Sequence, residues 1–227
     1  MGPLLAASLY FLFIHFAVSG TRWRDLLVAR LGERAYRALF SLASLVGILW
    51  MAHAYTRAPT IELWGLLLPL RPLVLVVVFV GVLLVVIGLA SPNPTSVGME
   101  GKLAVGAEAA RGITRITRHP FLWGVALWAA AHLAINGDLA SLILFGSLLL
   151  LALGGTVLID GKRRRRCGAQ WTQFAAVTSG IPFAAIAAGR NQLGPALREI
   201  GVLRPLIAVA IYAAIFVLHG RYGAPLT

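Results

Sequence analysis

Long apolar stretches alternate with short polar segments along the whole chain. Six stretches approach the roughly 20 residues that an α-helix needs to cross a bilayer core of about 30 Å. Because backbone groups in lipid must be hydrogen-bonded internally, and because these runs lack the alternation of barrel strands, the pattern predicts helices. The sequence therefore predicts an all-α, polytopic membrane helix bundle that forms a single domain over residues 1–227. The predicted transmembrane spans are 3–20, 37–56, 72–91, 120–135, 139–159 and 205–220.

Basic residues separate the segments between these helices into two classes. Of the 20 lysines and arginines, 17 lie in or at the edges of the segments 21–36, 92–119 and 160–204. Membrane proteins concentrate Lys and Arg in their cytoplasmic loops. The charge pattern therefore predicts that these three segments are cytoplasmic and that both termini lie on the outer, periplasmic side.

The composition agrees with a membrane protein and excludes other classes. Hydrophobic residues make up 59% of the chain and charged residues 12%, which is too few for the surface of a soluble domain. The net charge of +12 does not indicate nucleic-acid binding, because the basic residues fall between apolar blocks and form no single basic surface. The predicted partner is the lipid bilayer, and the oligomeric state is left open. The single cysteine, Cys167, excludes an internal disulfide.

Three cytoplasmic segments have recognisable local patterns. The first resembles an amphipathic interfacial helix, with Trp23 and leucines on one face, charged residues such as Arg24 on the other, and Gly32 at its end. The run 160–166, one acid and five bases, is interpreted as a solvated topology signal that meets lipid headgroups. The apolar segment 179–188 is too short to span, so we expect it to lie on or re-enter the membrane surface.

Five histidines are the candidate chemical groups. His15, His53, His132 and His219 lie within the predicted spans or near their ends, and His119 lies at the cytoplasmic mouth of the fourth span. Even a neutral imidazole needs hydrogen-bond partners in lipid, and packing or a helix-to-helix hydrogen bond explains a single such residue. Two that converge could ligate a b-type haem, whose porphyrin is itself lipophilic. The spans offer no cysteine pair or carboxylate set for zinc or di-iron, so haem b is favoured among metal cofactors.

His132 is the central candidate among them. By helical spacing it shares a face with Trp128 and with small residues, a combination that suits a flat macrocycle. At 1.5 Å per residue, His132 and His53 lie roughly 5 Å from the outer ends of their spans and His15 roughly 18 Å. A pair of His15 and His132 would be stretched along the membrane normal. Depth alone therefore favours His53 or His219 as the partner of His132.

Arg118, His119 and Pro120 form a corner at the start of the fourth span that has two interpretations. As structure, proline suits the first turn of a helix, and an arginine anchors that helix at the interface. As function, arginine and imidazole at a helix amino terminus form a binding site for an anion or a cofactor headgroup. The sequence does not choose between the two.

Six motifs stand out along the chain, namely Gly32–Arg37, Ile113–Pro120, Trp123–Gly124, Ala131–His132, Asn136–Asp138 and Thr178–Ile186. Together they resemble the NnrU family, bacterial membrane proteins linked to denitrification. The resemblance extends over nearly the whole chain and implies a multi-pass protein of the bacterial inner (cytoplasmic) membrane. A plant relative of that family is zeta-carotene isomerase, in which haem b supports cis–trans isomerisation of a carotenoid double bond. The resemblance implies that His132 and His15 match the two haem-ligating histidines, and with them the metal-binding and catalytic positions.

Three functional hypotheses follow. The first is a haem b protein that, if it is an enzyme, catalyses redox-dependent cis–trans isomerisation of a carotenoid or other hydrophobic polyene. The second follows from a resemblance of the Arg-His-Pro corner to isoprenylcysteine methyltransferases, and implies S-adenosylmethionine bound by Arg118 and His119. That family's later acidic pair is missing here, where only Asp160 stands in a basic run. The third is a non-enzymatic, haem- or nitric-oxide-responsive protein of denitrification.

Overall fold

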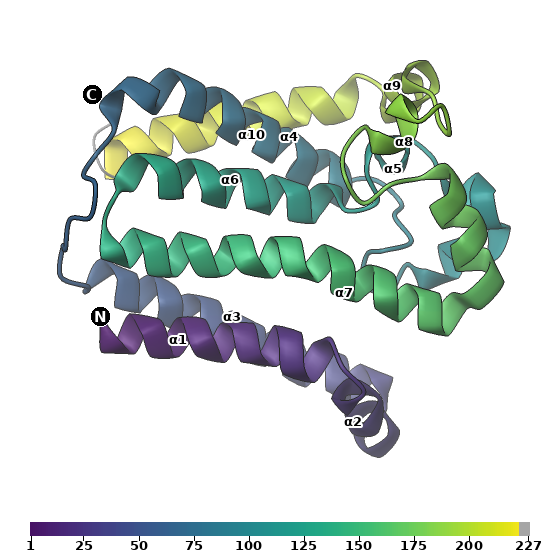
Figure 1. The fold of residues 1–227 in the computed structure, drawn as a ribbon, viewed down its shortest axis with the longest axis horizontal. Helices are drawn as coiled ribbons and strands as arrows, with labels where there is room; N and C mark the ends of the chain where they lie inside the picture. The colour runs from purple at the N-terminus through teal and green to yellow at the C-terminus, as the bar shows by residue number, and fades with distance from the viewer. Residues whose placement is uncertain (223–227) are drawn as a thin grey trace. The chain divides into compact units, whose positions relative to one another are not determined.

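The structure is a computed structural model that describes residues 1–222 of the chain, with side chains through residue 219 (Figure 1). Most of the described residues are helical, and their only bridge of β type is the isolated pair Glu62 and Asp138. They divide into two compact units. Unit 1 contains Met1–Val74 and Ala129–Leu158, and unit 2 contains Leu75–Trp128 and the chain from Ile159 onward. Helices α6 and α7 each contribute one part to either unit.

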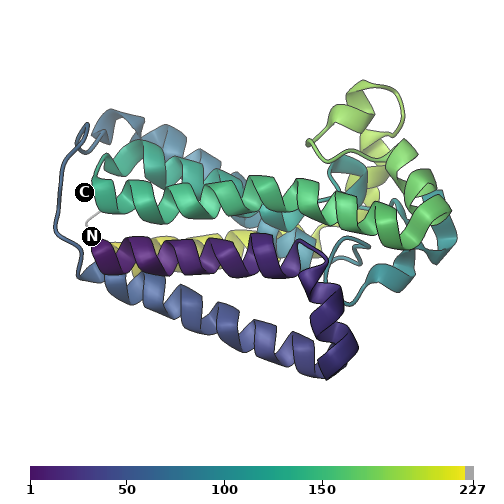
Figure 2. The same ribbon diagram turned by 60° about the horizontal axis from the view of Figure 1, so that its bottom comes forward.

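In unit 1 the first two long helices pack side by side (Figures 1 and 2). Their contact depends on Gly47, where an added Cβ would lie 2.9 Å from Phe11, so the aromatic ring takes the place of a side chain. Leu4, Ala54 and Ala140 form a small buried cluster at the other end of the unit. The helices of this part are α1 (Gly2–Phe13), α2 (Trp23–Leu31) and α3 (Glu33–Thr56).

The end of the first span is a π-helix over Ile14–Ser19 and not a continuation of the α-helix. Such segments insert an extra residue into the helical turn and occur often at functional sites. His15 lies within it. The insertion changes which side of the helix each residue faces, so α-helical spacing from the sequence does not give the direction of the His15 side chain.

Unit 2 is built on closely packed helices whose approach depends on glycine. A Cβ on Gly124 would lie 2.5 Å from the carbonyl oxygen of Gly81, and a Cβ on Gly88 would lie 2.9 Å from the Pro120 ring. The short helices α5, α8 and α9 gather at one end of the unit (Figure 1). The elements are α4 (Arg71–Leu89), a 3₁₀ stretch (Glu100–Ala109), α5 (Ile113–Ile116), α6 (Pro120–Asn136), α7 (Leu139–Val177), α8 (Ala184–Ala187), α9 (Leu193–Ile200) and α10 (Leu203–Tyr222).

The prediction of an all-helical membrane protein is confirmed at the level of fold class, since each predicted span coincides with a helix. By length and hydropathy, four helical segments in the described chain can cross a membrane, namely Gly2–Ser19, Glu33–Thr56, Leu68–Leu89 and Leu139–Val177. The pair Leu193–Ile200 and Leu203–His219, bent by 70°, brings the number to five if it counts as one span. Helix α6 is apolar but shorter.

Two local predictions were wrong. The segment 160–204 does not begin as a loop, because α7 continues through residue 160 to Val177, with a non-helical residue at Gly168. Helix α2 forms and ends at Gly32 as predicted, but Arg24 is not on a polar outer face. It is 5% exposed, 2.5 Å from the Glu33 carboxylate and stacked over the Tyr36 ring. Ion pairing with the start of α3 keeps this arginine inside, while Trp23 stays exposed.

Candidate functional site

The Arg-His-Pro corner is the most highly connected polar site in the described part of unit 2. Pro120 begins α6, and Thr117, three residues earlier, has extended backbone angles that end the short helix α5. The Thr117 hydroxyl accepts a hydrogen bond from the His119 backbone N–H and donates one to the Gly180 carbonyl. The side chain of His119 is 1% exposed. The corner is therefore buried and not part of the surface.

Asp160, from α7, holds both basic residues of the corner. Its Oδ2 lies 2.5 Å from Arg118 Nη2, and its Oδ1 lies 2.7 Å from His119 Nε2. The Arg118 guanidinium also lies over the ring of Trp171, another residue of α7, at 5.4 Å from the ring centroid, which is a cation–π contact. Each carboxylate oxygen thus serves one partner, which is the charge-assisted geometry that makes such bonds strong in a partly buried site.

A second ring of contacts fixes the backbone of the corner. The Arg118 carbonyl accepts hydrogen bonds from Asn93 Nδ2 at 3.0 Å and Thr95 Oγ1 at 2.7 Å. Arg163 donates to the carbonyls of Thr95 and Ser96 and lies 2.8 Å from Glu100. The proline-rich turn after α4 is therefore folded around the corner and clamped from the other side by α7.

The segment after α7 closes over the same corner. The Arg118 backbone N–H donates to the Ser179 carbonyl at 2.9 Å, and Trp123 Nε1 donates to the Gly180 carbonyl at 2.7 Å. Phe183 then adopts a left-handed conformation with φ 64°, and its N–H donates to the Ile116 carbonyl. A non-glycine residue in this region is uncommon and is held here by those contacts. The segment predicted to meet the membrane surface is packed against the corner.

Asp160 is the residue of this site that sequence reasoning missed. It was interpreted as part of a solvated basic run, and that interpretation was wrong for Asp160 and for Arg163, which is 3% exposed. The two lie three residues apart on α7 and so share a helix face, while Arg164, Arg165 and Arg166 are exposed. The three-residue spacing of Asp160 and Arg163 could have indicated that both face the same side of a helix. That inference requires knowing that α7 continues past residue 159.

The arrangement favours the structural interpretation of the corner. Because Asp160 engages the guanidinium of Arg118 and the imidazole of His119, the corner offers no open cationic site of the kind that an incoming anion needs. The remaining Arg118 nitrogen, Nε, is buried and has no hydrogen-bond partner among the described residues. The Arg118 side chain therefore acts as a clamp that joins the start of α6, α7 and the segment 178–180.

The histidines His15 and His132 of unit 1 lie in aromatic surroundings. His15 Nδ1 is 2.8 Å from the Phe11 carbonyl, and its ring contacts the rings of Phe11 and Phe40 at centroid distances of 4.4 and 5.1 Å. His132, on α6, stacks on Phe145 of α7 at 4.9 Å. A carbonyl that accepts from Nδ1 fixes the tautomer and leaves the Nε2 lone pair available to a metal.

The contacts of α7 give the relative levels of these two histidines within unit 1. Phe145 is at the level of His132, and Gly154 is at the level of Phe16, whose ring would lie 2.8 Å from an added Cβ. Their separation of nine positions corresponds to about 13 Å along the helix. His15 and His132 are therefore offset along the helix axes, as the depths of the predicted spans also implied.

His53 is on another side of its helix. The face of α3 toward α7 carries Tyr55, whose hydroxyl shares a hydrogen bond of 2.9 Å with Ser141 and whose ring contacts Phe145. Two residues along an α-helix correspond to about 200° of rotation, so His53 points away from this contact, and it is exposed.

Trp128 lies one turn before His132 on α6, with its backbone close to Gly81 of α4.

The turn between α6 and α7 is tied down by hydrogen bonds. The Gly137 carbonyl accepts from the backbone N–H groups of residues 63–65, and the Asp138 carboxylate accepts from the Ser141 N–H at the start of α7. Asn136 donates to the Ser141 hydroxyl. In the described part of the chain, no three His, Cys, Asp or Glu side chains form a metal-binding group. A metal here would depend on paired imidazoles.

Comparison with known proteins identifies the family of this chain. Residues 3–225 match the family described as NnrU protein. The chain is also 27% identical over 216 residues to the protein named 15-cis-zeta-carotene isomerase, chloroplastic, of Arabidopsis thaliana. That alignment covers 91% of this chain and 56% of the plant protein, so the chain spans about half the length of this curated relative. No solved structure matches it. Since the match covers nearly every residue, the chain belongs to the NnrU family.

Proposed function

We propose that this protein binds haem b within unit 1 through His132 and a second intramembrane histidine, and that it isomerises a cis double bond of a hydrophobic polyene. The observation that carries the proposal is the state of His15, whose Nδ1 is held by the Phe11 carbonyl so that Nε2 is presented as a lone pair. The relationship to a carotenoid isomerase supports the choice of reaction.

The donor chemistry fits this cofactor. Neutral imidazoles in apolar surroundings are common axial ligands of b-type haem, and the aromatic neighbours Phe11, Phe40 and Phe145 provide flat apolar contacts. When bound, haem iron supplies a Lewis-acidic centre beside the substrate. His132 and His15 are the proposed ligands. Because their levels differ by about 13 Å along the helices, both imidazoles would have to reach toward the cofactor from opposite ends. His53 is the alternative to His15, and it would need a rotation of α3 to face His132.

The other residues of unit 1 would exclude water and orient the substrate. Isomerisation of a double bond requires no net proton transfer, so no general acid or base has to be found near the histidines. The stacking of His132 on Phe145, and the Tyr55–Ser141 hydrogen bond beside it, hold α3, α6 and α7 together at this level. A rigid apolar wall of this kind selects a substrate by shape.

The membrane arrangement belongs to the same proposal. It has six spans, counting α6 and α10 with the four longer segments, and both termini on the outer side of a bacterial inner membrane. The support is the cytoplasmic bias of the basic residues and the coincidence of each predicted span with a helix. Fusion of a cytoplasmic and a periplasmic reporter to each loop tests it. Periplasmic reporter activity at residues 92–119 would contradict the orientation.

An absorption spectrum of the purified full chain tests the cofactor. Protein produced with ample haem is expected to show a Soret band that His132→Ala abolishes, because one axial ligand is lost. His15→Ala, His53→Ala and His219→Ala are compared to identify the second ligand, since each of the three histidines was a candidate partner of His132. A missing Soret band in the wild type, or an unchanged band in His132→Ala, would overturn the assignment.

The reaction is tested separately by chromatography of carotenoid isomers. The reconstituted protein is mixed with a 15-cis polyene in liposomes under reducing conditions, and the isomers are separated. We expect conversion that depends on haem and on His132. Haem binding without any conversion would retain the cofactor assignment and reject the reaction.

A further inference from the structure

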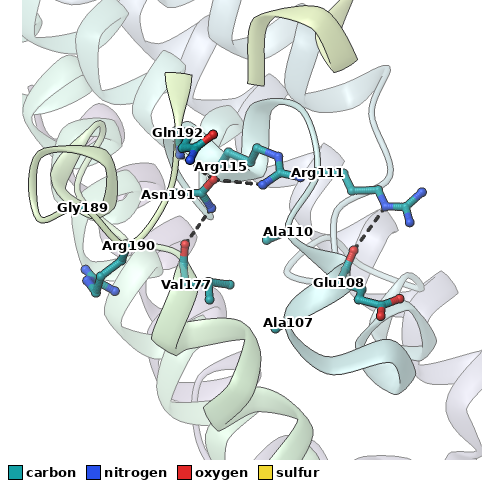
Figure 3. Close-up of a pocket in the computed structure, with 10 residues that line it drawn as sticks. All are labelled: Ala107, Glu108, Ala110, Arg111, Arg115, Val177, Gly189, Arg190, Asn191 and Gln192. Carbon is teal, nitrogen blue, oxygen red and sulfur yellow. Dashed lines mark hydrogen bonds between the residues drawn. The ribbon is translucent and has the colours of Figure 1, made fainter. Parts of the chain in front are cut away.

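Unit 2 contains a polar cavity of about 380 Å³ that the sites described above do not use (Figure 3). It lies between the end of the 3₁₀ stretch, α5, the last turn of α7 and the turn 189–192. Ligand cavities commonly range from about 300 to 1,000 Å³, so this one suits a small ligand or a headgroup.

The lining of the cavity has an excess of positive charge. Arg111, Arg115 and Arg190 contribute to it, against a single acid, Glu108. A second carboxylate, Glu199, lies behind Arg115 and pairs with it. One positive charge therefore remains uncompensated, and guanidinium groups are the side chains best suited to phosphate and carboxylate oxygens.

Arg115 is held rigidly at the inner wall. It forms two parallel hydrogen bonds of 2.9 Å with Glu199, and its Nη1 donates to Asn191 Oδ1 at 3.0 Å. The hydrogen bond with Glu199 raises the pKa of Arg115 above its ordinary value. Asn191 is fixed in turn, because its amide donates to the Val177 carbonyl. This wall is preorganised, which lowers the entropic cost of binding a ligand.

The other two arginines have donors to spare. Arg111 uses Nε in a hydrogen bond to the Glu108 carbonyl, and no other hydrogen bond of its guanidinium is found among the described residues. Arg190 donates from Nη1 to the carbonyls of Ala176 and Thr178 at the end of α7. Figure 3 shows Arg111 and Arg190 on opposite sides of the cavity. In Figure 3 both guanidinium groups point outward from the rim of the cavity, so each has to swing inward to contact an anion there.

The setting of the cavity is amphiphilic. Its floor is made of Ala107, Ala110 and Val177, and the chain leads directly from its wall into α9. Helix α9 buries Ala196 and Ile200 but exposes leucines on its other face. An amphipathic helix of this kind lies in a membrane interface, so the mouth of the cavity is expected at headgroup level. Leu193 and Leu197 are those exposed leucines.

We propose that this cavity binds a phosphate monoester group, which is supplied either by an anionic lipid headgroup or by a soluble phosphate. The inference goes beyond the proposed haem chemistry and does not depend on it. Arg115 and Asn191 form the fixed wall of the site, and Arg111 and Arg190 provide the further donors at its rim.

Titration calorimetry of the full chain in dodecyl maltoside tests the proposal with two probes, short-chain phosphatidic acid and inorganic phosphate. The matched variants are Arg111→Glu, inside the cavity, and Arg164→Glu, on the exposed run of α7. Loss of a charge-assisted contact and reversal of its charge are expected to weaken binding about ten- to a hundredfold in Arg111→Glu. The control is expected to bind within about twofold of the wild type, since exposed charges act weakly.

Each result has a defined meaning. Binding of phosphatidic acid alone, lost in Arg111→Glu, identifies a lipid headgroup, and binding of inorganic phosphate with the same dependence identifies a soluble phosphate. No heat with either probe overturns the proposal. Equal weakening in the two variants also overturns it, because the effect would then be general surface electrostatics. The Soret band is unaffected in either case, so failure here is distinguishable from failure of the haem assignment.

Discussion

Asp160→Asn is the most informative single substitution, because it removes the charge that holds Arg118 and His119 and keeps the shape of the side chain. The side chains of Asp160, Arg118 and His119 are 19%, 12% and 1% exposed. Breaking a buried pair by neutralising one partner costs about 3–5 kcal/mol. The amide oxygen can still accept one hydrogen bond, so we expect about 3 kcal/mol, at the lower end of that range.

Thermal unfolding followed by tryptophan fluorescence measures this effect. For a chain of this size each kcal/mol corresponds to roughly 2–4 °C, so Asp160→Asn should lower the Tm by about 6–12 °C. Asp25→Asn is the matched control, because it makes the same chemical change at a carboxylate that is 57% exposed and leaves the Arg24–Glu33 ion pair in place. It should alter the free energy of unfolding by about 0.5 kcal/mol or less.

A double-mutant cycle separates the ion pair from general packing. Asp160→Leu combined with Arg118→Met leaves no unpaired buried charge, so the double variant should be more stable than the two single effects added together predict. If Asp160→Asn unfolds at the wild-type Tm, or if the two single effects are additive, the reasoning about the clamp is refuted.

Four other predictions follow from the same contacts. Gly124→Leu should prevent close packing of α4 and α6, because a Cβ would lie 2.5 Å from the Gly81 carbonyl oxygen, and loss of monodisperse protein in size-exclusion chromatography would show it. Arg163→Met should release the turn 92–99, with faster limited proteolysis there, whereas Arg165→Met should not. Calorimetry with S-adenosylhomocysteine should give no heat, because Asp160 already engages Arg118 and His119; binding that Arg118→Met abolishes would restore the methyltransferase hypothesis. Gly137→Ala should destabilise the turn between α6 and α7, because Gly137 has φ 63° and a Cβ would overlap the Gly65 carbonyl; an unchanged Tm would contradict this.

The sequence by itself determined the elements that depend on local information. Runs of apolar residues located all six long helices, Pro120 marked the start of α6, and Gly32 marked the end of α2 with φ 80°. Hydropathy, proline and glycine act within a few residues of their position, so these features can be predicted without knowing what the chain packs against. The positions of the charged residues and of the histidines relative to these helices could be predicted in the same way.

Tertiary structure decided how those charges and histidines are used. Asp160 and Arg118 are separated by 42 positions, and nothing local distinguishes a solvated acid from one that clamps a corner. The length of α7 was underestimated because polar residues after residue 159 resembled a loop, whereas ion pairs with Arg118 and Glu100 allow that turn to be buried. The direction of His15 depends on a π-helix, and that of His53 on the contact that Tyr55 makes with α7. Ion pairs and ring contacts stabilise a buried polar side chain only through partners that are distant in sequence, and the folded chain alone brings those partners together.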